Sequence, residues 1–142
     1  MAILLKHVRE EAQPEDGARV LVDRQRPRGV DESSLELRSW LPMLGPSVEL
    51  RRWFDERPSQ WQLFRRQYVQ ELCDQKAVEA LTELEAIAAE EKRLTLLTGA
   101  KDQEHSHAAI LRDLLEGVKK PPATSRPARA AASGRMRARR PR

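Results

Sequence analysis

The sequence predicts an α/β fold with a small, mainly parallel sheet and helices packed on it. Two short runs rich in leucine and valine are bounded by turn residues, as buried strands are: "ARVLVD" at residues 18–23 and "RLTLLTGA" at residues 93–100. A long stretch of helical periodicity lies between them. A buried strand that is followed by a helical crossover and a second buried strand indicates a parallel pair covered by helices.

The first third of the chain predicts two strands and a kinked helix. "ILLKHV" at residues 3–8 has the apolar content of a strand, and the polar turn "EEAQPEDG" separates it from the strand at residues 18–23. In "DESSLELRSWLPML", residues 31–44, four apolar residues have helical spacing. These four are Leu37, Trp40, Leu41 and Leu44, and Pro42 among them predicts a kink or an end.

Three further helices are predicted before residue 92. Pro46 and Ser47 open a short one. The next begins at Ser59, because Ser59 and Gln62 have the spacing of a capping box and apolar residues then recur every three or four positions. The third runs from about Lys76 to Glu91.

A last helix is predicted after the strand at residues 93–100. Asp102 is expected to be its N-cap and Gly117 its C-terminal stop. The order of elements is therefore strand, strand, helices, strand, helix.

The charges divide the chain into a folded domain, residues 1–116, and a basic tail, residues 117–142. The tail holds nine basic residues and no acidic one, whereas the domain holds 17 basic and 22 acidic residues, a net charge of −5. Because the tail has no apolar periodicity, it is expected to be disordered. Such a tail binds polyanions without sequence preference, although biased composition alone also produces arginine-rich ends.

Several classes of protein are disfavoured by composition. Cys73 is the one cysteine of the sequence, which excludes an internal disulfide framework, and a lone thiol in a helical stretch is typical of a core residue. No apolar run is long enough for a signal peptide or a membrane span. We therefore expect a cytoplasmic protein without a membrane partner.

Polar groups follow both buried strands, which predicts a ligand site. In an open α/β sheet, ligands bind beyond the carboxyl ends of the strands, and arginine offers a fork that matches phosphate or carboxylate. The start of the last helix would add free N–H groups. The predicted anion-binding residues are Arg24, Arg28 and Lys101, and the predicted acid–base residues are Asp23, Asp102 and His105.

Simpler interpretations of these residues stay open. Arg24 could pair with Asp102 or Asp23 and merely hold the strand ends together. No metal is predicted, because His105 and His107 would point about 200° apart on a helix, although a single histidine with the two aspartates remains conceivable. His107 shares an apolar stripe and is expected to be structural. No phosphate-binding glycine loop or dinucleotide fingerprint is present, so no cofactor is predicted.

Four blocks of the sequence resemble one known family. They are "GARVLVDRQRPRGV", "WLPMLGPSVELRRWF", "WQLFRRQYVQEL" and "TLLTGAKDQEHSHAAIL". In order and spacing they are similar to the YeaO-like family, domain of unknown function family 488, of bacteria and archaea. The resemblance runs from Ile3 to Leu115 and implies a compact α/β fold without an established reaction. Where the family tends to have aromatic residues, this chain has Arg26 and Thr98.

Two hypotheses of function follow. In the first, the protein binds, and could transform, a small phosphate- or carboxylate-bearing molecule at the strand ends. In the second, it is an accessory protein that binds nucleic acid through its tail. No feature of the sequence favours a third class, a protein that serves only to bind other proteins.

Overall fold

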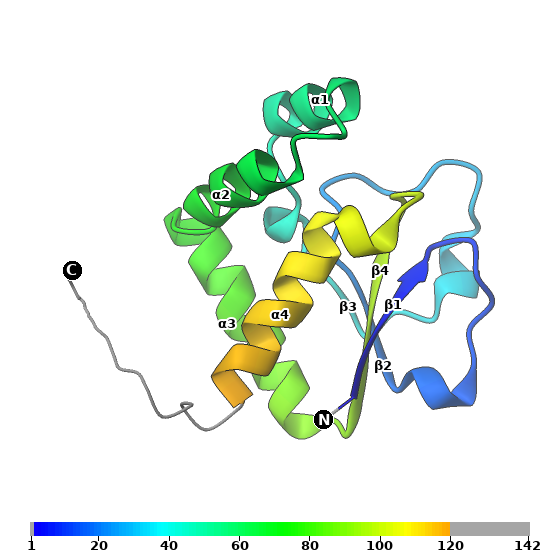
Figure 1. Cartoon of the computed structure of the whole chain (residues 1–142). Coiled ribbons are helices and arrows are strands. Elements are labelled where there is room, and N and C mark those ends of the chain that lie inside the picture. The colour runs from blue at the N-terminus through cyan, green and yellow to red at the C-terminus, as the bar shows by residue number, and fades with distance from the viewer. Residues whose placement is uncertain (1, 120–142) are drawn as a thin grey trace. The chain divides into compact units, whose positions relative to one another are not determined.

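The computed structural model describes residues 2–119 and has the α/β architecture that the sequence predicts (Figure 1). The strands are β1 (Ala2–His7), β2 (Ala18–Leu21), β3 (Ser39–Trp40) and β4 (Arg93–Thr98). The α-helices are α1 (Val48–Glu56), α2 (Trp61–Glu71), α3 (Gln75–Glu90) and α4 (His107–Lys119). Four short 3-10 turns are η1 (Pro14–Asp16), η2 (Glu32–Leu35), η3 (Pro42–Leu44) and η4 (Gln103–His105).

The four strands form one parallel sheet in the order β1-β4-β2-β3. The central strand β4 pairs with β1 along six residues and with β2 along four, so that Leu96 lies between Leu5 and Val20. The segment from β3 to β4 carries α1, α2 and α3. This is the helical crossover that the sequence predicts, and it brings the carboxyl ends of β2 and β4 to the same edge of the sheet.

The two faces of the sheet are covered differently. Within residues 2–112, α3 lies on one side, and the loops that contain η1 and η2 lie on the other (Figure 1). Because side chains alternate along a strand, Leu96 faces the side of α3 while Leu97 faces the loops. There Leu97 packs in a buried cluster with Leu21, Val8 and Leu35, the last of which comes from η2.

A buried polar cluster that the sequence pattern does not predict also lies beside β2. Asp16 of η1 accepts hydrogen bonds from Arg19 Nη1 at 2.5 Å and from Lys6 Nζ at 3.0 Å. Arg19 Nε also donates to the carbonyl of Leu35 at 2.6 Å. Asp16 and Arg19 are only 2% and 3% exposed, so the cluster joins the β1–β2 connection to η2 without contacting much water.

The predicted helix over residues 31–44 is wrong. Asp31 caps the short turn η2 by accepting from Ser33 N, and Glu36 then has a left-handed φ of 49° that no helix allows. The backbone continues into β3, and Leu41 N donates to Leu21 O at 2.9 Å. The main chain is therefore bonded to the sheet, and the helical spacing of its apolar residues reflects burial from two sides.

Two predicted helix starts are also wrong. α2 begins at Trp61, after Gln60, whose side chain makes no capping bond, so the expected start at Ser59 with its capping box is not formed. The last helix begins at His107 rather than after Asp102. Asp102 precedes the turn η4 and makes no capping bond with its side chain, and the extended Ser106 separates this turn from α4.

The end of the last helix also differs from the prediction. α4 passes Gly117 and reaches Lys119, since a single glycine costs a helix only about 1 kcal/mol relative to alanine.

The chain divides into two units, residues 1–112 and 113–142, and the candidate functional site belongs to the first. Of the predicted disordered tail, residues 120–142 lie outside the described residues. Within residues 2–119, no helix is long and apolar enough to cross a membrane.

Candidate functional site

Asp23 lies where β2 and β4 end, and its carboxylate joins the two strand ends to α4. Oδ1 accepts from Thr98 Oγ1 at 2.7 Å, and Oδ2 accepts from the backbone N–H of Gly99 at 2.7 Å. His107 Nε2 lies 3.2 Å from Oδ1. The segments that follow the two strands are thus adjacent, as the parallel arrangement requires.

The environment of Asp23 keeps it ionised. Burial acts to raise the pKa of this carboxyl, but the hydrogen bond and charge of His107 and the donors Gly99 and Thr98 outweigh burial, so its pKa lies below the ordinary value. A carboxylate with a lowered pKa and three donors around it is a weak general base. The geometry therefore suits Asp23 to holding groups in place.

His107 belongs to the hydrogen-bond network at the strand ends, which its position on an apolar stripe does not predict. Its side chain is 2% exposed, and Nε2 lies 2.9 Å from the carbonyl oxygen of Val22. Because a carbonyl only accepts, Nε2 must carry a proton. His107 is also the first residue of α4, while His105 belongs to η4, so the premise that both histidines lie on one helix is wrong.

The guanidinium groups of the arginines that follow β2 have different partners. Arg24 donates from Nε to Pro46 O at 3.1 Å and from Nη2 to Gly45 O at 3.0 Å, which ties β2 to the loop before α1. Arg26 pairs with Glu32 at 3.4 Å and lies over the ring of Trp40.

Gly45 makes the anchoring of Arg24 possible. A Cβ atom at this position would meet the backbone nitrogen of Arg24 at 2.4 Å. Of the other predicted anion-binding residues, Arg28 has an exposed side chain and lines neither of the two clefts described next.

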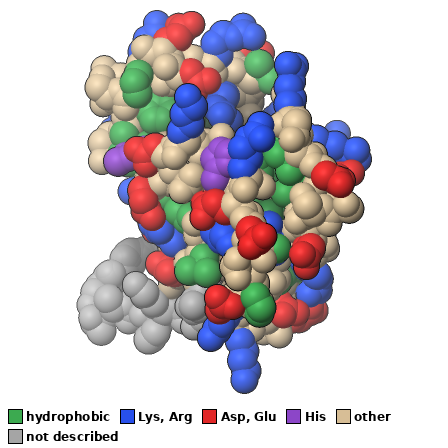
Figure 2. Space-filling view, turned by 90° about the vertical axis from the view of Figure 1, so that its right-hand side faces the viewer, with side chains coloured by type: hydrophobic (Ala, Val, Ile, Leu, Met, Phe, Trp, Pro, Cys, Tyr) green, Lys and Arg blue, Asp and Glu red, His purple; other side chains and the backbone are tan. Residues whose placement is uncertain are grey.

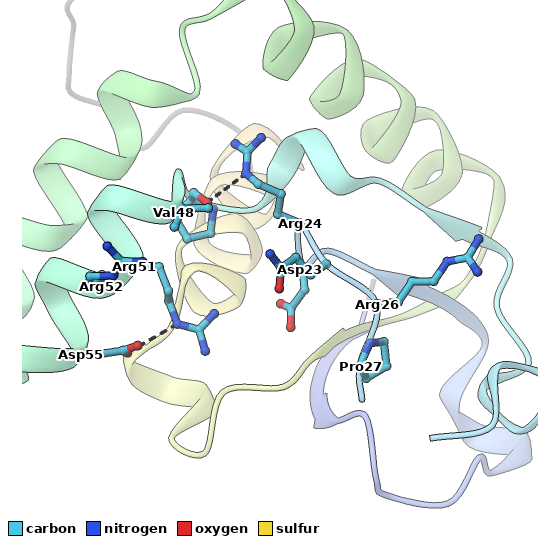
Figure 3. A pocket seen from close by; sticks show the side chains of 10 residues that line it. Asp23, Arg24, Arg26, Pro27, Val48, Arg51, Arg52 and Asp55 are labelled. Carbon is cyan, nitrogen blue, oxygen red and sulfur yellow. Dashed lines mark hydrogen bonds and ion pairs between the residues drawn. The ribbon is translucent and has the colours of Figure 1, made fainter. Parts of the chain in front are cut away.

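The first of these clefts, which we call the cationic cleft, has a volume of about 380 Å³ (Figure 3). Four arginines surround it against two aspartates, and Arg51 and Arg52 come from α1. Arg51 Nε lies 3.5 Å from Asp55 Oδ1, a pair whose side chains are both largely exposed. The cleft is lined by Asp23, Arg24, Gln25, Arg26, Pro27, Pro46, Val48, Arg51, Arg52 and Asp55.

The second cleft, which we call the aromatic cleft, has a volume of about 520 Å³ and lies beyond the end of β4. It contains Lys101 and the pair in which His105 Nδ1 lies 2.8 Å from Asp102 Oδ2. The hydrogen bond with His105 lowers the pKa of the Asp102 carboxyl. The cleft is lined by Arg51, Phe54, Asp55, Pro58, Phe64, Gly99, Ala100, Lys101, Asp102, His105, Ser106 and His107.

The predicted site residues are therefore divided between two neighbouring clefts. Asp23 and Arg24 line the cationic cleft, whereas Lys101, Asp102 and His105 line the aromatic cleft. Arg51 and Arg52 are not among the site residues that the sequence predicts. The spacing of these two arginines in the sequence does not reveal whether they line a cleft or face solvent. That depends on the tertiary fold, which brings α1 over the strand ends.

Charge is unevenly distributed on the surface. Figure 2 shows Lys and Arg side chains gathered over the upper part of one face, at the end of the molecule where α1 lies.

In the described part of the chain, no three His, Cys, Asp or Glu side chains form a group that could hold a metal ion.

Fold and site together define a small α/β protein with two open clefts at the carboxyl edge of a parallel sheet. Residues 2–132 match the family model described as the inactive DUF488-N3 subclade, and the chain belongs to this family. The match extends past Leu115, where the resemblance of the four sequence blocks ended, and includes part of the basic tail.

Relatives among curated proteins agree with this assignment. The chain is 37% identical to the uncharacterized protein YeaO of Escherichia coli over 119 residues, which cover 83% of this chain and all of that protein. It is 34% identical over 115 residues to the uncharacterized proteins Rv3073c of Mycobacterium tuberculosis and Mb3100c of Mycobacterium bovis, covering 81% of this chain and 94% of each. These relatives confirm the predicted likeness to the YeaO-like family. No solved structure matches the chain significantly.

Proposed function

We propose that this protein binds a small molecule bearing a phosphate or carboxylate group in the cationic cleft. The observation that carries the proposal is the excess of guanidinium groups around a cavity of about 380 Å³. Guanidinium matches the planar or tetrahedral oxygens of such groups with paired hydrogen bonds. Two donors of Arg24 are occupied by carbonyls, so Arg51 and Arg52 supply the main contacts, with Arg24 adding its charge.

Binding without turnover is the better supported form of this function. The lowered pKa of Asp23 makes it a weak base, and the family model is described as an inactive subclade. Asp102 and His105 remain the groups that could exchange a proton with a ligand, and Lys101 could add a positive charge beside them. All three line the neighbouring cleft, whereas Arg28 lines neither cleft and has no part in the proposal.

The test is a titration of the full chain with inorganic phosphate, followed by amide chemical shifts in NMR spectra. The signals of Gln25, Arg51 and Arg52 should move together, and the double variant Arg51→Gln, Arg52→Gln should raise the Kd at least tenfold, because two charge-assisted contacts are lost. The control is Arg65→Gln, Arg66→Gln, two exposed arginines of α2 outside both clefts. Equal Kd values for the two double variants would refute the proposal.

A second candidate function is non-specific binding of nucleic acid through the basic tail. It is favoured by the separation of charge along the sequence, in which nine basic residues and no acidic one follow Glu116. An acidic domain repels a polyanion, so the tail would carry this binding alone. Truncation of the chain after Lys119 tests this function, because it removes eight of the nine basic residues.

A further inference from the structure

The two clefts are neighbours that share one wall. Arg51 and Asp55 line both the cationic cleft and the aromatic cleft. A molecule that places an anionic group against Arg51 can therefore extend into the aromatic cleft without leaving the protein. Figure 3 shows Arg51 reaching from α1 toward the loop that follows β4, whose residues Gly99 and Ala100 line the second cleft.

The periodicity of α1 explains this arrangement. Residues three and four positions apart lie on the same side of a helix, so Arg51, Phe54 and Asp55 point in similar directions. Arg52 and Val48 lie beside them, on the side of the cationic cleft. A single turn of helix thus presents guanidinium groups to one cleft and an aromatic ring to the next.

The aromatic wall is held in place by other rings. Phe54 stacks on Phe64 with a centroid distance of 4.3 Å and lies 5.9 Å from Trp61. Trp61 meets the ring of His105 edge-on at 5.2 Å. Phe64 is buried whereas Phe54 is half-buried, so Phe54 is the ring of this stack that offers surface to a ligand.

The aromatic cleft also has a polar part, in which His105 contacts the ring stack through Trp61. Lys101, His105 and Ser106 line it, with Asp102 bonded to His105. A cleft with one ring wall and one rim of hydrogen-bonding groups suits a flat ring that carries polar atoms at its edge.

We infer that the ligand is an aromatic phosphate or carboxylate, with its ring in the aromatic cleft against Phe54 and its anionic group in the cationic cleft on Arg51 and Arg52. This inference rests on the proposed function and names the class of ligand. Both cleft volumes, about 380 and 520 Å³, lie in the range of small-molecule sites.

The experiment compares phenyl phosphate with methyl phosphate, which share the anionic group and differ in the ring. By calorimetry, the full chain should bind phenyl phosphate about tenfold more tightly, which is the expected contribution of one well-packed ring. Phe54→Leu, which keeps an apolar side chain, should remove most of that difference and leave the Kd of methyl phosphate unchanged. Arg52→Gln should weaken both ligands by the same factor.

A second measurement uses the unaltered protein and does not depend on the folding of a variant. Intermolecular nuclear Overhauser effects should connect the phenyl protons of the ligand to the ring of Phe54. Equal affinity for the two phosphates, or phenyl contacts away from Phe54, would overturn the inference and leave the proposed function standing. Failure of both phosphates to bind would overturn both.

Discussion

At the scale of single residues, the buried carboxylates of this protein serve structure more than reaction. Asp23 joins β2, β4 and α4, and Asp16 joins the β1–β2 connection to η2. The sequence places Asp23 at a strand end, which suffices to predict it as a site residue. The sequence predicts only a structural role for its partner His107, because a histidine on an apolar stripe gives no sign of the aspartate that it meets.

Asp16 leads to a prediction about pH. Burial acts to raise its pKa, but hydrogen bonds from Gln13, Lys6 and Arg19 outweigh burial and lower it. The unfolded chain therefore takes up a proton near pH 3.8 that the folded protein accepts only at lower pH. The stability that Asp16 contributes is fully present above that pH, and the free energy of unfolding should fall as the pH drops below it.

The measurement is urea unfolding at several pH values for the protein and for Asp16→Asn. At neutral pH the variant should lose about 3–5 kcal/mol, because Arg19 is left buried without its charged partner. Its stability should also vary less than that of the protein as the pH falls below 4. Asp74→Asn is the control, since asparagine caps α3 as well as aspartate does and should change stability little. Parallel pH profiles of the protein and Asp16→Asn would contradict the assignment.

At the scale of elements, the position of α1 depends on its first turn. Ser47 Oγ accepts from Leu50 N at 3.1 Å and donates to Glu71 Oε2 of α2 at 2.6 Å. The backbone N–H of Ser47 also donates to Glu71 Oε1 at 2.8 Å. This N-cap therefore fixes the start of α1 and ties it to α2.

Removing the cap should weaken both fold and binding. Ser47→Ala should cost about 1 kcal/mol of stability, the usual effect of losing an N-cap serine, and should raise the Kd for inorganic phosphate because Arg51 and Arg52 lose their fixed position. Chemical denaturation and the phosphate titration measure the two effects. Ser47→Thr, which keeps the hydroxyl, should restore both, and a Kd unchanged in Ser47→Ala would show that the cap does not position the arginines.

The elements that the sequence predicts correctly are those with a strong local signal. The strands at residues 2–7, 18–21 and 93–98 and the helix Gln75–Glu90 agree with the patterns of their residues. β3 has only two residues, which is too short for any periodicity. The apolar residues within 31–44 have helical spacing because they are buried, although the segment is not a helix. Asp31, Glu36 and Pro42 form turns there instead.

The sequence likewise predicts one part of the candidate site and not the other. Its location at the strand ends follows from the parallel sheet, and Asp23, Lys101, Asp102 and His105 lie there. The cationic cleft needs Arg51 and Arg52, which come from a helix 25 residues or more beyond β2. Only the tertiary fold brings that helix over the strand ends, so no local pattern could assign these arginines.

At the scale of the whole molecule, the division of charge leads to a test of the second candidate function. Residues 1–119 hold 18 basic and 22 acidic residues, a net charge of −4, and residues 120–142 hold eight basic residues and no acidic one. If the tail binds nucleic acid, the full chain should bind duplex and single strands alike. Its affinity should fall steeply with salt, since log K drops by about 0.9 per phosphate neutralised on duplex DNA.

Truncation after Lys119 is the matched comparison. The shortened chain should lose detectable binding to DNA, measured by fluorescence anisotropy, while its melting temperature and its Kd for inorganic phosphate should stay the same. Sequence-selective binding that survives both truncation and high salt would contradict this assignment, because residues 1–119 would then recognise the nucleic acid.

The wall shared by the two clefts has a consequence for the relatives of this protein. One nine-residue helix, α1, supplies Arg51, Arg52 and Phe54, while the segments that follow β2 and β4 supply most of the other lining residues. Ligand choice would then be a modular trait, carried by a segment shorter than a tenth of the chain. Exchanging that segment between homologues should exchange their preferences and leave the scaffold intact, so that a family can diversify what it recognises without redesigning its core.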